Sequence, residues 1–235
     1  MNLLPNIKII GLTLYLVKQR ILVLADSHIG YEEALNKQGI LIPRLQFKEI
    51  MSNLEQVFKQ VKPKLIIMLG DIKHEFGTIS KQEWRDTLNL LDYLLEKAKV
   101  VLIKGNHDNI LGPLAKKKNL EIKDYFAVDN VFLCHGHKLM DDNSELKKAE
   151  TIIIGHEHPA ITIRDDVRVE KYKCYLLGKY KKKNLIVMPS FNFVTEGTDV
   201  LQEKLLSPFL TNIDDFKAYI LGDKIYDFGR VSKLK

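Results

Sequence analysis

The feature that most constrains the fold of this chain is a set of five short apolar runs, each ending in a polar side chain. Runs of β-branched and aliphatic residues this short are typical of buried strands. They span residues 21–24, 65–69, 100–103, 131–133 and 151–154. Two or three positions after the end of each run stands a side chain that can bind a metal ion: Asp26, Asp71, Asn106, His135 and His156.

The third run leads directly into Gly105, Asn106, His107 and Asp108. An amide offers a neutral oxygen to a metal ion, an imidazole can bind a metal or carry a proton, and a carboxylate can orient either. Taken alone, these residues could equally form an ordinary turn. Their recurrence after four other runs favours a shared site, because ligands bind at the carboxyl ends of the strands in open α/β sheets.

Two further histidines extend the set. His28 lies two residues beyond Asp26, and His158 lies two beyond His156, a spacing that places both side chains on one side of an extended segment. Seven ligands are too many for one four-coordinate zinc ion but suit two metal ions about 3.5–4 Å apart, an arrangement used for displacement at phosphorus. Nitrogen and oxygen ligands without thiolates favour Mn²⁺, Fe²⁺, Zn²⁺ or Co²⁺ over Ca²⁺ or Mg²⁺.

The ordered motifs resemble those of the calcineurin-like metallophosphoesterases. The matching strings are Asp26-Ser27-His28, Gly70-Asp71, Gly105-Asn106-His107-Asp108, His135-Gly136 and Gly155-His156-Glu157-His158. Longer strings at residues 25–32, 70–75 and 189–193 are similar to archaeal phosphoesterases related to SbcD-type nucleases and to bacterial DNA-ligase-associated relatives. SbcD-type nucleases also carry a DNA-capping domain, for which this chain is too short, so processive action on duplex ends is not expected.

The resemblance implies an α/β fold, namely a two-sheet αββα sandwich with a dinuclear metal site at the carboxyl ends of the strands. We expect residues 1–235 to form this single domain. By resemblance, the first metal ion would be held by Asp26, His28, Asp71 and His158. Asp71 would bridge to the second ion, which Asn106, His135 and His156 would complete. The expected ions are Mn²⁺, with Fe, Zn, Co or Ni as alternatives.

The resemblance makes His107 the catalytic residue, which would protonate the leaving alkoxide or stabilise the transferring phosphoryl group. Asp108 could orient His107 or simply cap the turn, and the turn is favoured. His135 is a better ligand than His137 because the motif begins at His135. His74 and Arg44 could contact a substrate phosphate, although a surface histidine and a helix-entry arginine are equally good interpretations.

The excess of basic over acidic residues is compatible with a phosphodiester substrate. Thirty-six lysines and arginines exceed thirty aspartates and glutamates by six, with clusters at 116–118, 147–148 and 171–183. Such clusters could meet nucleic acid or could be a solvated surface. We therefore predict a phosphodiesterase, with nucleic acid as substrate. The alternatives are a cyclic-nucleotide phosphodiesterase, a phosphomonoesterase, or a non-catalytic interaction scaffold. Protein partners are not predicted.

No apolar window reaches the roughly 18 residues of a membrane span, and no signal peptide is evident, so a cytoplasmic location is expected. Cys134 and Cys174 form no CxxC pair and are expected to be small buried residues. Apolar periodicity predicts helices over residues 45–61, from Ser80 onward, and over 144–150. Ser80 and Glu83 have the spacing of a capping box at the start of the second helix. The periodicity also predicts an edge strand at 12–17, a hairpin over 161–177 that turns at 165–166, and a second hairpin over 218–228.

Overall fold

The computed structural model describes residues 1–75, 77, 79–108, 111–164 and 167–234. These residues group into two compact units. Unit 1 comprises Met1–Asp124 and Phe191–Thr195, and unit 2 comprises Tyr125–Ser190 and Glu196–Lys235. Each unit contains one sheet. The single domain expected over residues 1–235 stays a prediction.

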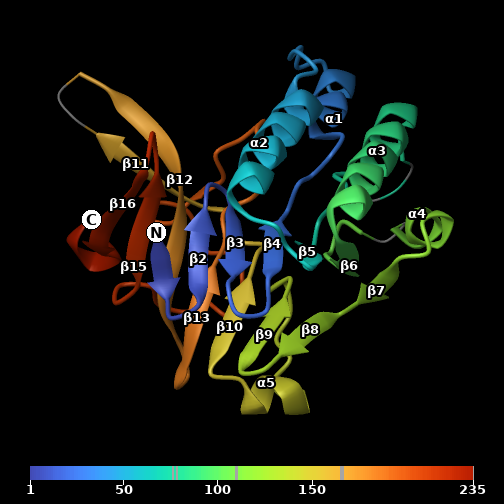
Figure 1. The fold of residues 1–235 in the computed structure, drawn as a ribbon. Coiled ribbons are helices and arrows are strands. Elements are labelled where there is room, and N and C mark those ends of the chain that lie inside the picture. Colours follow the sequence, from blue (N-terminus) through green and yellow to red (C-terminus); the bar gives the residue numbers. More distant parts are fainter. Residues whose placement is uncertain (76, 78, 109–110, 165–166, 235) are drawn as a thin grey trace. The chain divides into compact units, whose positions relative to one another are not determined.

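The strands of the unit 1 sheet follow one another in chain order (Figure 1). Seven strands of this sheet lie in the described ranges. The strands β1 to β4 pair antiparallel, whereas β4 to β7 pair parallel. Parallel pairing brings the carboxyl ends of β4, β5 and β6 to one edge of the sheet. The bounds are β1 Asn2–Leu4, β2 Ile7–Ile10, β3 Thr13–Leu16, β4 Ile21–Ala25, β5 Leu65–Leu69, β6 Lys99–Ile103 and β7 Glu121–Lys123.

The expectation of an edge strand at residues 12–17 is wrong. The strand β3 lies between β2 and β4, and all four of its residues are buried. The reason is that residues 2–10 form two further strands, which pair outside β3 and cover its edge. Those strands are short and separated by a tight turn, so their apolar pattern is weak.

The two long helices of unit 1 are confirmed as amphipathic elements. Helix α2 spans Gln46–Gln60 and α3 spans Lys81–Lys97, and their buried leucines and isoleucines pack with residues of β4, β5 and β6. Ser80 caps α3 through a capping box with Glu83, as the sequence predicts. Two short helices, α1 at Tyr31–Lys37 and α4 at Leu111–Lys117, were not predicted.

The sheet of unit 2 mixes parallel and antiparallel pairs. The order along its main path is β14-β11-β12-β13-β10-β9-β8, and β15 pairs with both β12 and β16. Strands β9, β10 and β13 are parallel neighbours. The bounds are β8 Tyr125–Val128, β9 Val131–Cys134, β10 Thr151–Ile154, β11 Pro159–Arg164, β12 Val169–Tyr180, β13 Lys183–Val187, β14 Thr198–Asp199, β15 Lys217–Leu221 and β16 Ile225–Arg230.

Both predicted hairpins of unit 2 are confirmed as the antiparallel pairs β11–β12 and β15–β16. The turn expected at residues 165–166 lies outside the described residues. Helix α5 covers Ser144–Lys148 and is shorter than expected. Asn143 caps it, its side chain accepting from the N–H groups of Glu145 and Leu146.

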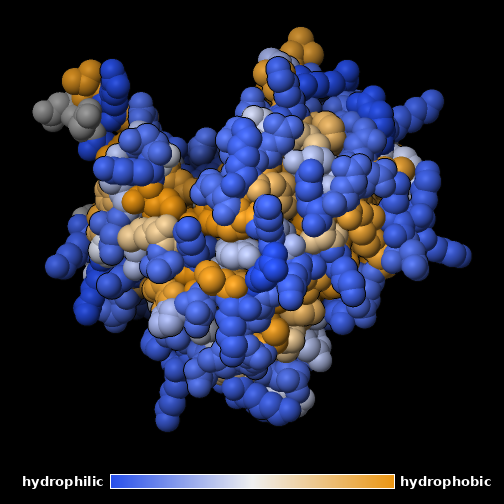
Figure 2. Space-filling model, in the orientation of Figure 1, coloured by the Kyte–Doolittle hydropathy of each residue, from blue (hydrophilic) through white to orange (hydrophobic). Residues whose placement is uncertain are grey.

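The two cysteines are buried in unit 2, as expected. Burial raises the pKa of the Cys134 thiol to about 12, so this group behaves as a small apolar residue. On the face drawn in Figure 2, hydrophilic side chains predominate and hydrophobic ones form smaller patches between them. None of the helices in the described ranges is long and apolar enough to cross a membrane.

Ile66 tests how strongly the core of unit 1 supports the sheet. It lies in β5 with no exposed side-chain area. Ile66→Ala should lower the free energy of unfolding by about 2–5 kcal/mol, and Ile66→Val by only about 0.5–1.5 kcal/mol, because the remaining cavity is smaller. Urea denaturation measures both. Val17→Ala, at a 45% exposed position, is the control and should change little.

Candidate metal centre

Three loops of unit 1 are held together directly beyond the strands that precede them. The N–H group of Asp26 donates to the carbonyl of Gly70 over 3.3 Å, and that of His28 donates to the carbonyl of Asp71 over 2.9 Å. Gly70 N–H in turn donates to the carbonyl of Ile103. Parallel pairing thus continues past the ends of β4, β5 and β6, and it fixes the first three motifs side by side.

The carboxylate of Asp71 lies at the centre of these loops, with its side chain 2% exposed. Its Oδ1 accepts a hydrogen bond from the N–H group of His107 over 2.8 Å. Its Oδ2 lies 3.9 Å from Nε2 of His28 and 3.9 Å from Nε2 of His107. One buried carboxylate therefore faces two imidazoles.

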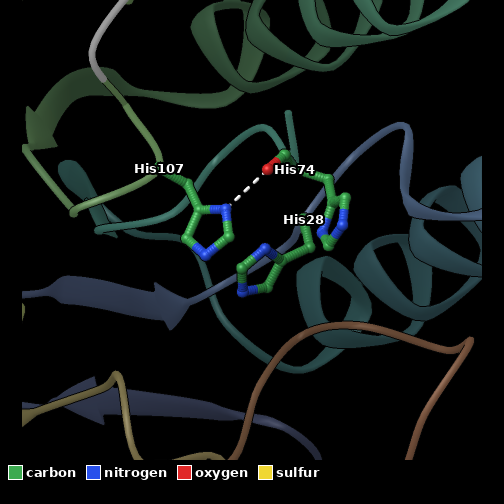
Figure 3. A group of neighbouring side chains, drawn as sticks. All are labelled: His28, His74 and His107. Atoms are coloured by element: carbon green, nitrogen blue, oxygen red, sulfur yellow. Dashed lines mark hydrogen bonds between the residues drawn. The ribbon is translucent and has the colours of Figure 1, made fainter. Parts of the chain in front are cut away.

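Three imidazoles converge in unit 1, each from a different loop (Figure 3). His28, His74 and His107 offer ring nitrogens within 4.8 Å of one another, close enough to hold a metal ion. Nδ1 of His107 lies 2.5 Å from the carbonyl oxygen of His74. His74 also stacks on Tyr31, with ring centroids 4.1 Å apart.

Asn106 provides a test of whether these residues suit a metal ion. Its Oδ1 is buried and has no hydrogen-bond partner among the described residues. A buried polar atom without a partner costs free energy unless a ligand satisfies it. An amide oxygen is a good ligand for a hard or borderline cation, so the donor set of unit 1 fits a metal centre.

Left-handed backbone marks the candidate ligands of both units. Of ten non-glycine residues with positive φ in the described ranges, five are candidate ligands, with φ between 34° and 66°. This region is unfavourable for residues with a Cβ, and such strain gathers at functional sites. The five residues are Asp26, His28, Asp71, His156 and His158.

Three histidines of unit 2 form a second group. Nδ1 of His135 lies 2.9 Å from Nδ1 of His137, and the ring centroids of His135 and His156 are 4.9 Å apart. His137 is therefore in contact with the predicted ligand His135. The carbonyl of His158 accepts from the N–H group of Thr198, which holds the loop after β10 against β14.

Two buried carboxylates in the motifs accept hydrogen bonds from backbone N–H groups. Asp108 accepts from the N–H groups of Ile72 and Gly105, so it ties two loops together, in line with the favoured turn role. Glu157 accepts from the N–H groups of Leu206 and Ser207. Burial raises the pKa of the Glu157 carboxyl, and these two N–H groups act to lower it.

The two predicted substrate-binding residues have different surroundings. His74 joins His28 and His107, as described above. Arg44 forms an ion pair with Glu33 and lines an open pocket with Lys81 and Arg85. Sequence reasoning missed Lys73, which lies inside the matched string 70–75 and is buried beside the imidazole cluster.

Residues 19–224 match the family model of the calcineurin-like phosphoesterases. The chain belongs to this family. It is thus a phosphoesterase, a hydrolase that acts on phosphoester bonds, and its family uses divalent metal ions, as predicted. The identity of the metal stays a prediction.

One solved structure supports the fold of this calcineurin-like phosphoesterase. The chain is 18% identical to a nuclease MPE from Pseudomonas putida, with a TM-score of 0.66, over 92% of this chain and 91% of that chain. A predicted phosphoesterase from Streptococcus pneumoniae is 15% identical, with a TM-score of 0.38, over 89% and 97%. No curated protein matches the chain. The predicted α/β fold of the metallophosphoesterase type is confirmed.

Gly105 offers a direct test of the geometry around Asp71. A Cβ at residue 105 would lie 2.0 Å from Asp71 Oδ1 and 2.3 Å from Asp71 N. Gly105→Ala should therefore displace the carboxylate and remove bound metal from the purified protein, as measured by elemental analysis. Gly112→Ala is the matched control, because a Cβ there meets nothing within 4 Å. Full metal content in Gly105→Ala would contradict the assignment of Asp71 as a ligand.

Proposed function

We propose that this phosphoesterase hydrolyses phosphodiesters with two divalent metal ions and that its substrate is nucleic acid. The observation that carries the proposal is the buried carboxylate of Asp71, which lies 3.9 Å from Nε2 of both His28 and His107. A carboxylate and imidazoles in one polar cluster suit the binding of a cation and of a phosphoryl group.

The proposed metal ligands follow the family motifs. Asp26, His28, Asp71 and His158 would hold one ion, and Asp71, Asn106, His135 and His156 the other. Mn²⁺ is the proposed ion in each position, with Fe, Zn, Co or Ni as alternatives. Two such ions would supply activation of a water molecule and neutralisation of charge on the phosphoryl oxygens.

His107 is the proposed catalytic residue, with a defined proton on its ring. A carbonyl oxygen can only accept a hydrogen bond, so Nδ1, which lies 2.5 Å from the carbonyl oxygen of His74, carries a proton. Nε2 is then the position that gains and loses a proton. With Nε2 protonated, His107 can donate to the leaving oxygen, while His74 beside it would contact the phosphate.

Three observations support a nucleic-acid substrate. The neighbour from Pseudomonas putida is a nuclease, and its fold covers nearly the whole chain. The strings at 25–32, 70–75 and 189–193 are similar to SbcD-related phosphoesterases, and we propose that relationship too. Lysines of the three clusters are largely exposed, and ammonium groups in solvent can neutralise a phosphate backbone. A cytoplasmic location stays a prediction.

A cyclic-nucleotide phosphodiesterase or a phosphomonoesterase would need the same metal chemistry, so these remain the alternatives for the substrate. A non-catalytic scaffold is disfavoured, because each of the seven proposed ligand positions carries a residue able to bind a metal ion, and the proposed catalytic position carries a histidine.

Two variants test whether His107 acts as the proton donor and Asp71 as a metal ligand. His107→Ala should lower turnover of bis-p-nitrophenyl phosphate by roughly 10²–10⁴-fold, the contribution typical of a general acid, and should keep its metal. Asp71→Asn should lose bound metal. Turnover with Mn²⁺ and elemental analysis measure the two effects. If His107→Ala strips metal as thoroughly as Asp71→Asn, the roles are wrong.

The substrate class is tested by direct comparison. Labelled single- and double-stranded DNA and RNA, 2′,3′- and 3′,5′-cyclic nucleotides and a phosphomonoester are incubated with the Mn²⁺-loaded protein. We expect polynucleotides to be cleaved fastest, and their cleavage to weaken steeply as salt rises, because binding through several phosphates releases counterions. A small substrate gives the matched control and should respond little to salt. Efficient turnover of cyclic nucleotides with polynucleotides untouched would end the nuclease proposal.

A further inference from the structure

Two buried charges, neither of them a proposed metal ligand, lie behind His74 and His107. Lys73 has no exposed side-chain area, and Glu83 is 1% exposed in the first turn of α3. Burying a charge is costly unless hydrogen bonds and an opposite charge compensate it. Core packing alone does not explain why two charged side chains are buried beside the imidazole cluster.

The carboxylate of Glu83 holds the loop that follows β5. Its Oε1 accepts from the N–H groups of His74 and Glu75, each over 3.0 Å, and its Oε2 accepts from Ser80 N–H. Burial raises the pKa of the Glu83 carboxyl, whereas the Glu75 N–H group and the charge of Lys73 act to lower it. Glu83 thus does more than complete the capping box.

One peptide group connects Glu83 to His107. The carbonyl of His74 and the N–H group of Glu75 belong to the same planar unit and point to opposite sides of it. Glu83 binds that N–H group, and Nδ1 of His107 lies 2.5 Å from that carbonyl oxygen. Because the unit is rigid, the carboxylate sets the direction of the carbonyl that orients the imidazole.

Lys73 fixes the same arrangement from the other side. Its ammonium group donates to the carbonyl of His107 over 2.6 Å and also to the carbonyl of Glu75. The ammonium group therefore joins the loop after β5 to the loop after β6. Gly30 leaves room for this arrangement, because a Cβ there would lie 2.9 Å from the Cβ of Glu83.

We propose that Glu83 and Lys73 are positioning residues that fix the tautomer and the direction of the His107 ring, so that Nε2 is presented to the leaving oxygen. This inference rests on the proposed role of His107 as a proton donor. Neither residue contacts the substrate in this account. Each acts through the backbone of residues 74, 75 and 107.

The test compares two diesters that differ in how much they need a proton donor. In bis-p-nitrophenyl phosphate the leaving phenolate is stable without a proton, whereas in diphenyl phosphate it gains far more from general acid catalysis. A variant that misplaces His107 should therefore lose more activity on diphenyl phosphate. A variant that only destabilises the fold or loses metal should lose activity equally on both.

Glu83→Met removes the acceptor and nearly keeps the volume, and it should lower kcat on diphenyl phosphate at least about tenfold more than on the nitrophenyl ester. Lys73→Met should act in the same sense. Glu83→Gln keeps an acceptor oxygen and should restore most of the activity. Thr87→Val is the matched control, because Thr87 is buried on the same helix and its hydroxyl has no partner in the described ranges.

A second readout needs neither turnover nor metal. Long-range ¹H–¹⁵N correlation spectra of the metal-free full chain should show His107 protonated at Nδ1. Glu83→Asp, which keeps the charge but shortens the side chain, should give a mixture of tautomers. This variant and this measurement decide the question if Glu83→Met does not fold.

The outcomes separate this inference from the proposed function. If the wild-type protein hydrolyses neither diester with Mn²⁺, the proposed function fails. If His107→Ala shows the difference between the diesters but Glu83→Asp and Lys73→Met lose activity equally on both, the positioning role is overturned. An unchanged His107 tautomer in Glu83→Asp would overturn it as well.

Discussion

The buried carboxylate of Asp71 is the constraint on which the candidate site of unit 1 depends. Its side chain is 2% exposed, and a carboxylate in that position is stable only when donors or cations surround it. A backbone N–H group satisfies Oδ1, and two imidazoles lie 3.9 Å from Oδ2. A Cβ at residue 105 would enter the same space, which explains the glycine. Residues 105 and 107 of the loop after β6 thus lie directly against the carboxylate of Asp71 on the loop after β5.

Strained backbone accompanies five of the seven candidate ligands, and these five occur in both units. Each left-handed non-glycine residue costs on the order of 1–3 kcal/mol and persists only where other bonds hold it. In unit 1, the bond from His28 N–H to the carbonyl of Asp71 joins two such residues. In unit 2, His158 is held through Thr198. The strain recurs in two differently built loops, so it follows from where the side chains must point and not from one local fold.

The sequence predicts the strands that carry the site well, because strands buried on both faces show unbroken apolar runs. Strands β4, β5 and β10 begin and end within one residue of those runs. The polar residues that follow two or three positions after each run then locate Asp71 and Asn106. The paired strands β1 and β2 escape prediction because their stability comes from nonlocal pairing. Glu83 appears only as a capping residue, since the loop that it binds is fixed by tertiary contacts.

The number of lysines in the sequence does not tell which of them are exposed to solvent. That distinction decides which lysines could bind nucleic acid. Lys73 is fully buried and Lys173 is 7% exposed, and both donate to oxygens within their own units. Such cations cannot replace counterions on a phosphate backbone. Exposed lysines can, even when paired, because pairs such as Lys181 with Asp141 contribute only about 0–1 kcal/mol and exchange readily. Electrostatic attraction to a polyanion must therefore arise from the solvated lysines, while the buried ones shape the loops that hold the reacting groups.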